Sequence, residues 1–346
     1  MGGSTEKSRG VCLFGVRFAP FNVPLERRIQ TLGVLIQFFV MFVLPIATTF
    51  FFLLSALICP PLFLGYAFWL WRDWDSPRKG GYPSQWFRNL RLHKWFCDYF
   101  PMKLHATADL PTDKNYLIGI HPHGIVAHSG YQFMSNATGI NDRFPGIRFH
   151  IATLVANFLT PLRREWLLLH GMINCSKESL LHVLGGDGRG EVAILVVGGA
   201  EEALDAHPGR HRLTLVGRKG FVKIALQTGA QLVPCFAFGE NDCYEQAELP
   251  KEGLGRMFQR AWKRLTTFTW PAYHGRGVFN YSFGILPFRA ELNTVLGAPI
   301  DVEKTENPTQ EQIDSLHSLY VDRLTDLYET HKERFGVAKD NKLVIQ

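Results

Sequence analysis

The sequence predicts an α/β fold in which a membrane-embedded helical hairpin precedes the α/β domain. No charged residue occurs between residues 29 and 71, a stretch roughly twice the ~20 residues that one spanning helix needs. After this stretch, apolar runs typical of buried strands alternate with helix-like runs. That alternation indicates a central sheet, expected to be mixed, with flanking helices.

The charge-free stretch is the first element. Basic residues flank both of its ends: Arg27, Arg28, Arg72, Arg78 and Lys79. A hairpin returns both ends to one face, and the positive-inside rule makes that face cytosolic. Pro45 or Pro60-Pro61 could mark the connection. Three parts are expected. Residues 1–28 form a cytosolic tail, residues 29–71 form a membrane hairpin of two helices, and residues 72–346 form a domain that faces the cytosol. A very hydrophobic soluble hairpin is the alternative.

Strand and helix patterns define the domain that follows. Apolar runs predict four strands, at 116–120, 192–197, 232–238 and, with turns, 278–286. Helical periodicity predicts helices at 177–184, 220–228 and 309–335. Thr309 with Gln312 resembles a helix start, and Gly336 resembles a stop.

Composition narrows the class of function. The net charge of +6 and pI near 9.0 suit an anionic membrane surface or a phosphate-bearing ligand, and no nucleic-acid-binding module is recognisable. The six cysteines include no C-x-x-C pair, so neither a zinc site nor a disulfide framework is expected. The absence of a G-x-S-x-G sequence argues against a serine hydrolase.

The strongest candidate site is His121-Pro122-His123-Gly124, which follows the apolar run 116–120. The carboxyl end of a strand is where an α/β sheet usually presents functional groups. A neutral imidazole there is a candidate general base. A metal site would need further ligands beside His121, His123 and His128, and the sequence offers no matching set.

Two further clusters accompany these histidines. Gly198 and Gly199 end a predicted strand and are followed by Glu201 and Glu202. A carboxylate here either orients an imidazolium or caps a helix N-terminus. The basic residues Arg218, Lys219 and Lys223 surround the start of a predicted helix, an arrangement that suits phosphate. His182 and Asp187 have the H-x4-D spacing of glycerophospholipid acyltransferases, but His182 is interpreted as a helix residue.

These blocks, taken in order, resemble the monoacylglycerol/diacylglycerol acyltransferase (type-2 diacylglycerol acyltransferase) family. The matching segments are 24–28, 99–101, 121–124, 198–202, 218–221, 233–234, 238–241 and 274–277. The resemblance implies a multi-pass enzyme of the endoplasmic-reticulum membrane that transfers an acyl group from acyl-CoA to mono- or diacylglycerol, with no other cofactor. The family's glutamate corresponds to Glu202. Phe149-His150 departs from the family's usual Pro-His, although His150 is retained.

The resulting hypothesis makes His123 the general base, Glu202 its carboxylate partner and His121 a supporting group or an oxyanion donor. Which of the two histidines is the base stays open. The expected substrate-binding residues are Gly124, Gly198, Gly199, Arg218, Lys219, Lys223, Glu240 and Asn241. The expected partners are acyl-CoA, mono- or diacylglycerol and membrane lipid, and a homo-oligomer is compatible with the sequence. A wax or retinyl ester synthase and a non-catalytic lipid-binding protein are the alternatives.

Overall fold

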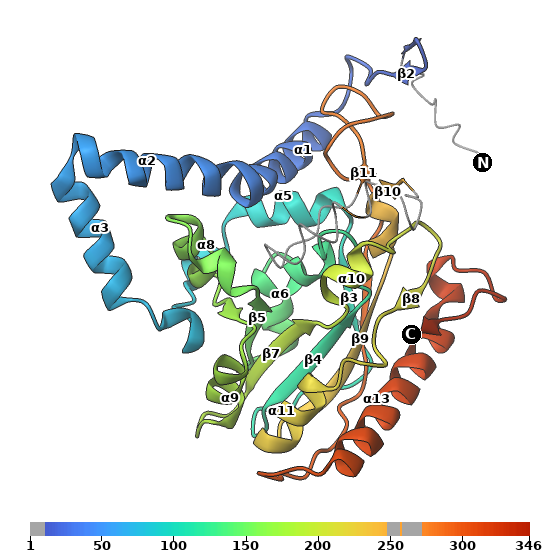
Figure 1. The fold of residues 1–346 in the computed structure, drawn as a ribbon. Coiled ribbons are helices and arrows are strands. Elements are labelled where there is room, and N and C mark those ends of the chain that lie inside the picture. Colours follow the sequence, from blue (N-terminus) through green and yellow to red (C-terminus); the bar gives the residue numbers. More distant parts are fainter. Residues whose placement is uncertain (1–10, 248–256, 258–271) are drawn as a thin grey trace.

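A seven-stranded mixed sheet forms the centre of the protein, as the sequence predicts (Figure 1). The computed structural model describes residues 11–247, 257 and 272–346, so the first ten residues of the predicted tail lie outside it. The strand order is β3-β12-β9-β4-β7-β5-β6, and only the β12–β9 pair is antiparallel. The strands are β3 (Lys103–Ala106), β4 (Tyr116–His121), β5 (Arg148–Thr153), β6 (Ile173–Asn174), β7 (Glu191–Val196), β9 (Gln231–Phe238) and β12 (Asn293–Leu296).

Three short strand pairs lie outside the central sheet. They are β1 (Cys12–Leu13) with β2 (Val16–Arg17), β8 (Arg212–Leu213) with β13 (Val344–Ile345), and β10 (Glu245–Gln246) with β11 (Tyr273–His274). Through the β8–β13 pair, the C-terminal segment is hydrogen-bonded to the segment that precedes α11 (Gly220–Thr228).

Two layers of helices cover the sheet, because successive side chains of a buried strand point to opposite faces. On β4, Leu117 belongs to the core under α9 (Lys177–Gly185), α11 and α13 (Gln310–His331), while Ile118 belongs to the core on the other face. The second face is covered by α5 (Arg91–Tyr99), α6 (Tyr131–Met134) and α8 (Arg163–Leu169). Shorter helices are α4 (Gln85–Arg88), α7 (Ile140–Arg143) and α10 (Gly199–Ala203).

Most predicted elements are confirmed. The runs at 116–120, 192–197 and 232–238 are β4, β7 and β9, and the three predicted helices are α9, α11 and α13. Thr309 and Gln312 form the expected capping box, and Gly336 ends the C-terminal turn with a φ of 80°. The strand predicted at 278–286 is wrong, because the Asn280 side chain accepts from Ser282 and Phe283 N–H groups and folds the segment into a turn.

The apolar stretch forms one long helix and one short helix. Helix α1 (Leu25–Phe38) continues through a π-helical turn (Phe39–Val43) into α2 (Leu44–Ile58), and Leu25–Ile58 is the one helix among the described residues long and apolar enough to cross a membrane. The helix ends at Cys59, and a separate helix, α3 (Pro60–Arg72), begins at Pro60-Pro61 and runs in a different direction (Figure 1).

The predicted boundary at residue 29 falls inside a helix that packs on the domain. Gly33 of α1 lies so close to α5 that a Cβ there would be 2.8 Å from the backbone nitrogen of Phe96. In Figure 1, α1 lies beside α5, whereas α2 extends away from the sheet. The second arm, α3, has 13 residues and spans ~20 Å, less than the ~30 Å of a bilayer core.

Candidate active site

The predicted site residues meet at one edge of the sheet. The segments that follow β7, β4 and β9 carry Glu202, the His121–Gly124 turn and Glu240, respectively, and these three strands are parallel neighbours. Their carboxyl ends therefore emerge side by side. The structure thus brings together three blocks that are separated by many residues in the sequence.

His121 is fully buried beneath α13. Its Nε2 lies 3.0 Å from the hydroxyl of Tyr320, which donates to the Gly119 carbonyl at 3.2 Å. Since the hydroxyl has one hydrogen, Nε2 of His121 donates to the tyrosine oxygen. The buried Nδ1 atom then carries a lone pair and has no partner among the described residues. Burial lowers the pKa of His121 to about 3, so the ring is neutral.

His123 is the more accessible histidine of the pair. Its Nδ1 lies 3.0 Å from the Gly124 carbonyl, and because a carbonyl oxygen only accepts, Nδ1 holds the proton and Nε2 is bare. Burial lowers the pKa of His123, although the bond to the Gly124 carbonyl acts in the opposite direction. The bare Nε2 is the nitrogen available to accept a proton.

Glu202 reaches His123 through the main chain. One carboxylate oxygen accepts from the backbone N–H of His123, and the other accepts from the N–H of Thr214 at 2.8 Å. The structure therefore differs from the prediction, because the Glu202 carboxylate binds the backbone of His123 and not its imidazole ring. A Cβ on Gly198 would overlap the Glu202 carboxylate, which explains glycine at that position. Gly199 adopts a φ of 63° and has open space beside it.

Glu240 supports the other end of the same turn. Its two oxygens accept from the N–H groups of His128 and Ser129, at 2.8 and 2.7 Å. Gly124 has a φ of 59°, and a Cβ there would approach the Glu240 side chain to 2.6 Å. Asn241 donates to the Arg210 carbonyl at 2.8 Å. Two buried carboxylates thus hold the segment from His123 to Ser129 by its backbone.

Both carboxyl groups have unusual proton affinities. Burial raises the pKa of Glu202 to about 7, against its hydrogen bonds from the His123 and Thr214 backbone. Burial also raises the pKa of Glu240 to about 7, against the hydrogen bonds from Ser129 and His128. Perturbed carboxyl groups of this kind concentrate at functional sites.

The predicted phosphate-binding residues are dispersed. Arg218 donates to Glu201 at 3.1 Å and lies 3.5 Å from the Gly198 carbonyl. Lys219 is paired with Asp314 of α13 at 2.7 Å, whereas Lys223 is exposed on α11. Of these three basic residues, Arg218 is therefore the one that contacts the site, through the Gly198 carbonyl.

The sequence did not indicate Tyr320 or Thr214 as members of the site. Tyr320 was visible only as an apolar-face residue of a helix, and its partner Gly119 only as a glycine within a strand. A Cβ on Gly119 would overlap the Tyr320 hydroxyl. A strand glycine before two histidines was the signal that another group approaches the backbone there.

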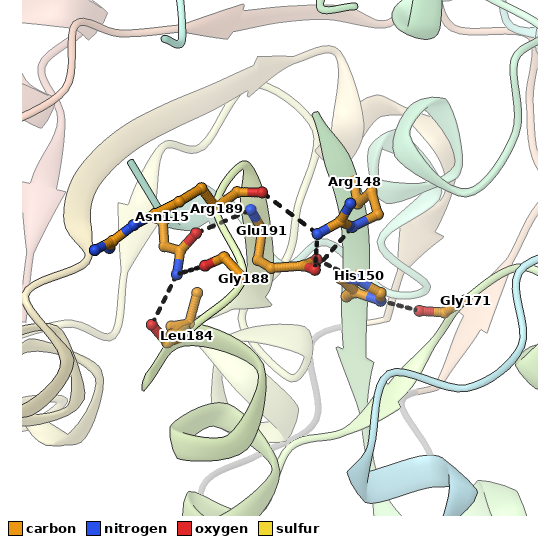
Figure 2. Close-up of polar contacts among 8 residues, drawn as sticks. All are labelled: Asn115, Arg148, His150, Gly171, Leu184, Gly188, Arg189 and Glu191. Carbon is orange, nitrogen blue, oxygen red and sulfur yellow. Dashed lines mark hydrogen bonds and ion pairs between the residues drawn. The ribbon is translucent and has the colours of Figure 1, made fainter. Parts of the chain in front are cut away.

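A direct histidine–carboxylate contact occurs instead at the amino end of β7, between His150 and Glu191 (Figure 2). Nε2 of His150 lies 3.0 Å from Glu191, and its Nδ1 donates to the Gly171 carbonyl at 2.9 Å. Glu191 also accepts from Arg148 Nε at 2.7 Å, and its N–H donates to Asn115. Glu191 and Gly171 thus hold His150 toward the amino ends of β5 and β7, whereas His121 lies at the carboxyl end of β4. His182 is exposed on α9, as expected for a helix residue.

No group of three or more histidine, cysteine, aspartate or glutamate side chains in the described part of the chain could hold an ion. The six cysteines are free thiols.

Comparison with known proteins identifies the family. A family model described as "Diacylglycerol acyltransferase" matches residues 51–346. The chain is 41% identical to 2-acylglycerol O-acyltransferase 1 of Bos taurus, over 96% of this chain and 99% of that protein. It is 42% identical to diacylglycerol O-acyltransferase 2 of Dictyostelium discoideum (92% and 96% covered) and 39% identical to the Homo sapiens enzyme of that name (93% and 84%).

One solved structure is a distant neighbour: the 1-acyl-sn-glycerophosphate acyltransferase PlsC from Thermotoga maritima aligns over 86% of this chain and 97% of its own, with a TM-score of 0.39 and 11% identity. That likeness is too weak to bear on function. The match to the family model and the identities near 40% over almost the whole length are decisive: this chain belongs to the diacylglycerol acyltransferase family.

Proposed function

We propose that this protein is an acyl-CoA-dependent O-acyltransferase that esterifies mono- or diacylglycerol, forming diacylglycerol or triacylglycerol. The observation that carries the proposal is the bare Nε2 of His123, placed at the carboxyl end of the sheet on a turn held by two buried carboxylates. The names of the relatives, 2-acylglycerol and diacylglycerol O-acyltransferase, support the choice of acceptor.

The reaction needs one base and no covalent enzyme intermediate, because a thioester is already activated. Nε2 of His123 takes the proton from the acceptor hydroxyl while that oxygen attacks the thioester carbonyl carbon. The tetrahedral intermediate then collapses, the carbon–sulfur bond breaks, and the imidazolium returns its proton to the departing thiolate. The products are an ester and free CoA.

The surrounding residues position this base. Glu202 and Glu240 fix the backbone of the turn, so they act as positioning residues. His121 lies at the start of this turn, and its hydrogen bond to Tyr320 restrains it. Gly124 and Gly198 make room for the Glu240 and Glu202 side chains, whereas Gly199 leaves open space that a substrate could occupy.

The apolar N-terminal helices would let the lipid substrates reach the site from the membrane. The described segment beyond Phe38 runs from residue 39 to residue 58, a length of ~30 Å in helical form, and its side chains are largely exposed. We assign it to the membrane, with the shorter α3 returning to the same face. The sheet domain then lies at the cytosolic surface of the endoplasmic reticulum, where both acyl-CoA and the membrane are accessible.

The test uses microsomes that contain the full-length protein and labelled oleoyl-CoA. Monoacylglycerol, diacylglycerol and a long-chain alcohol are offered separately, beside a His123→Ala control. Glycerolipid ester that disappears in the control supports the proposal. Ester formed only from the alcohol would assign wax synthesis instead, and no ester with any acceptor would refute catalysis.

A further inference from the structure

A cavity lies outside the proposed site, at the β3–β12 edge of the sheet. Its volume is about 810 Å³, within the ~300–1,000 Å³ typical of small-molecule sites. It is formed by the starts of β3 and β12, the turn after β9 and the segment that follows α13. The side chains used below are Lys103, His105, His211, Asp242, Arg334 and Phe335. None belongs to the catalytic turn.

The sheet register connects this cavity to the catalytic histidines. His105 on β3 pairs with Val295, Val295 pairs with Phe236, and Phe236 pairs with His121. These four residues form one row across the sheet, and their side chains therefore point to the same face. Three strand spacings separate His105 from His121, a distance of ~14 Å. An extended chain covers that distance in about four residue lengths, and the pantetheine arm of CoA is a chain of that order.

The cavity lies at the edge of the sheet opposite the apolar helices. Helices α2 and α3 contact the domain near α8, through bonds from Thr48 to the Pro161 carbonyl and from Tyr66 to Glu165. In Figure 1, these helices lie on one side of the sheet and the C-terminal segment lies on the other. A ligand in the cavity is thus a water-soluble molecule, or the water-soluble end of one, rather than an acyl chain.

Aromatic rings form part of the wall. The Phe335 ring packs against those of His105 and Phe238, with centroids 5.0 Å apart in both cases, and the Arg334 guanidinium lies 5.2 Å from the Phe335 centroid. Phe335 is only half-buried. Aromatic rings and arginine planes of this kind stack on nucleic-acid bases.

The polar side chains that line the cavity include both cationic and anionic groups. Arg334 is exposed and has no carboxylate partner among the described residues, while Lys103 pairs with Glu291 at 2.6 Å. The Nδ1 atom of His211 is buried without a partner within the described chain, and Asp242 is exposed. Cations suit phosphate groups, whereas an imidazole nitrogen and a carboxylate suit the amino group of a purine and the hydroxyls of a ribose.

We propose that this cavity binds the adenosine 3′,5′-diphosphate end of CoA. The inference rests on the proposed function, because it concerns the same acyl donor. CoA carries phosphate groups at two places, the pyrophosphate and the ribose 3′-phosphate. The cavity receives the nucleotide with its base against Phe335 and its 3′-phosphate near Arg334 and Lys103, and the pantetheine arm runs along the sheet edge toward His123.

The test compares oleoyl-CoA with S-oleoylpantetheine, which has the same thioester and lacks the nucleotide. The full-length enzyme with Lys103→Ala and Arg334→Ala should show a KM for oleoyl-CoA that is raised about tenfold, the size of a lost charge-assisted contact. Its KM for S-oleoylpantetheine and its KM for the acceptor should not change. Adenosine 3′,5′-diphosphate should inhibit the wild-type enzyme competitively with oleoyl-CoA and inhibit the variant about tenfold less.

The matched control is Arg323→Ala, which removes an exposed cation of α13 outside this cavity and should change neither KM. Equal effects of the double variant on both donors, or no effect on either, would overturn the inference. Wild-type enzyme that used both donors equally well would overturn it too. Loss of the proposed function has a different signature, since neither donor would then give ester with the wild-type protein.

Discussion

The hydroxyl of Tyr320 on α13 lies 3.0 Å from Nε2 of His121 at the end of β4. It reaches this position because Gly119, two residues earlier in the strand, has no side chain and accepts its hydrogen bond. The C-terminal helix thereby fixes the tautomer of a histidine in the proposed catalytic turn. This bond restrains the rotation of the ring on one side, and the sequence did not reveal it because the partners are 199 positions apart.

Gly119→Ala should be severely destabilising, because the added methyl group would occupy the space of the Tyr320 hydroxyl. Tyr320→Phe alone leaves the buried Nε2–H of His121 unpaired, at a cost of about 1–3 kcal/mol in the free energy of unfolding. In the Tyr320→Phe background, Gly119→Ala should cost less than it does in the wild type, since the overlapping oxygen is gone. Thermal unfolding of the four proteins in detergent measures the coupling. Strictly additive effects would contradict this account of the contact.

Glu202 and Glu240 should make stability depend on pH. Because burial raises both pKa values from 4.5 to about 7, the folded protein binds these protons more tightly than the unfolded chain. Their contribution is fully present below pH ~4.5 and is lost as pH rises through about 7. Each displacement corresponds to roughly 3 kcal/mol. Unfolding free energies measured between pH 4.5 and 7.5 should show the decline.

Glu240→Gln, which is neutral at every pH, should flatten part of that decline. Asp187→Asn, an exposed carboxylate in a surface loop, is the control and should leave the profile unchanged. An identical pH profile for wild type and Glu240→Gln would show that Glu240 does not titrate in this range.

The sequence predicted the central strands and the helices beside them, because β4, β7 and β9 are continuous apolar runs and α11 has a clear periodicity. It also placed Glu202 beside His123. It could not show that the carboxylate binds the backbone of His123, since spacing carries no information on which atoms meet. The short strands β3 and β12 escaped prediction because four residues are too few to show a period.

His123→Ala and His121→Ala should separate catalysis from support. His123 is the proposed base, so its removal should lower kcat at least about 100-fold. Because the side chain is only half-buried, the unfolding temperature should change little. His121 is fully buried, so its removal leaves a cavity, removes the donor to the Tyr320 oxygen and should lower stability as well as activity. Comparison of kcat with the unfolding temperature for both variants tests the assignment. A folded His123→Ala enzyme with near-normal kcat would refute it.

The pH profile of kcat/KM should reflect the lowered pKa of His123. A base acts in its neutral form, and burial, only partly opposed by the bond to Gly124, keeps this imidazole neutral below the ordinary value of 6.5. The acidic limb of the profile should therefore lie below pH 6.5. An acidic limb above that value would assign the proton transfer to another group.

Glu191→Gln should affect stability without affecting chemistry. Its carboxylate bridges Arg148 and His150 at the amino end of β7 (Figure 2). The six-residue strand from Glu191 to Val196 places it ~17 Å from the edge of the sheet that carries the proposed site. Weakening this half-buried bridge should cost about 1–3 kcal/mol, while kcat and both KM values stay unchanged. Although burial acts to raise the pKa of Glu191, the His150 and Arg148 bonds lower it, so the stabilisation is present above pH ~4.5 and is lost as pH falls. A loss of kcat at unchanged stability would instead connect this end of the sheet to the reaction.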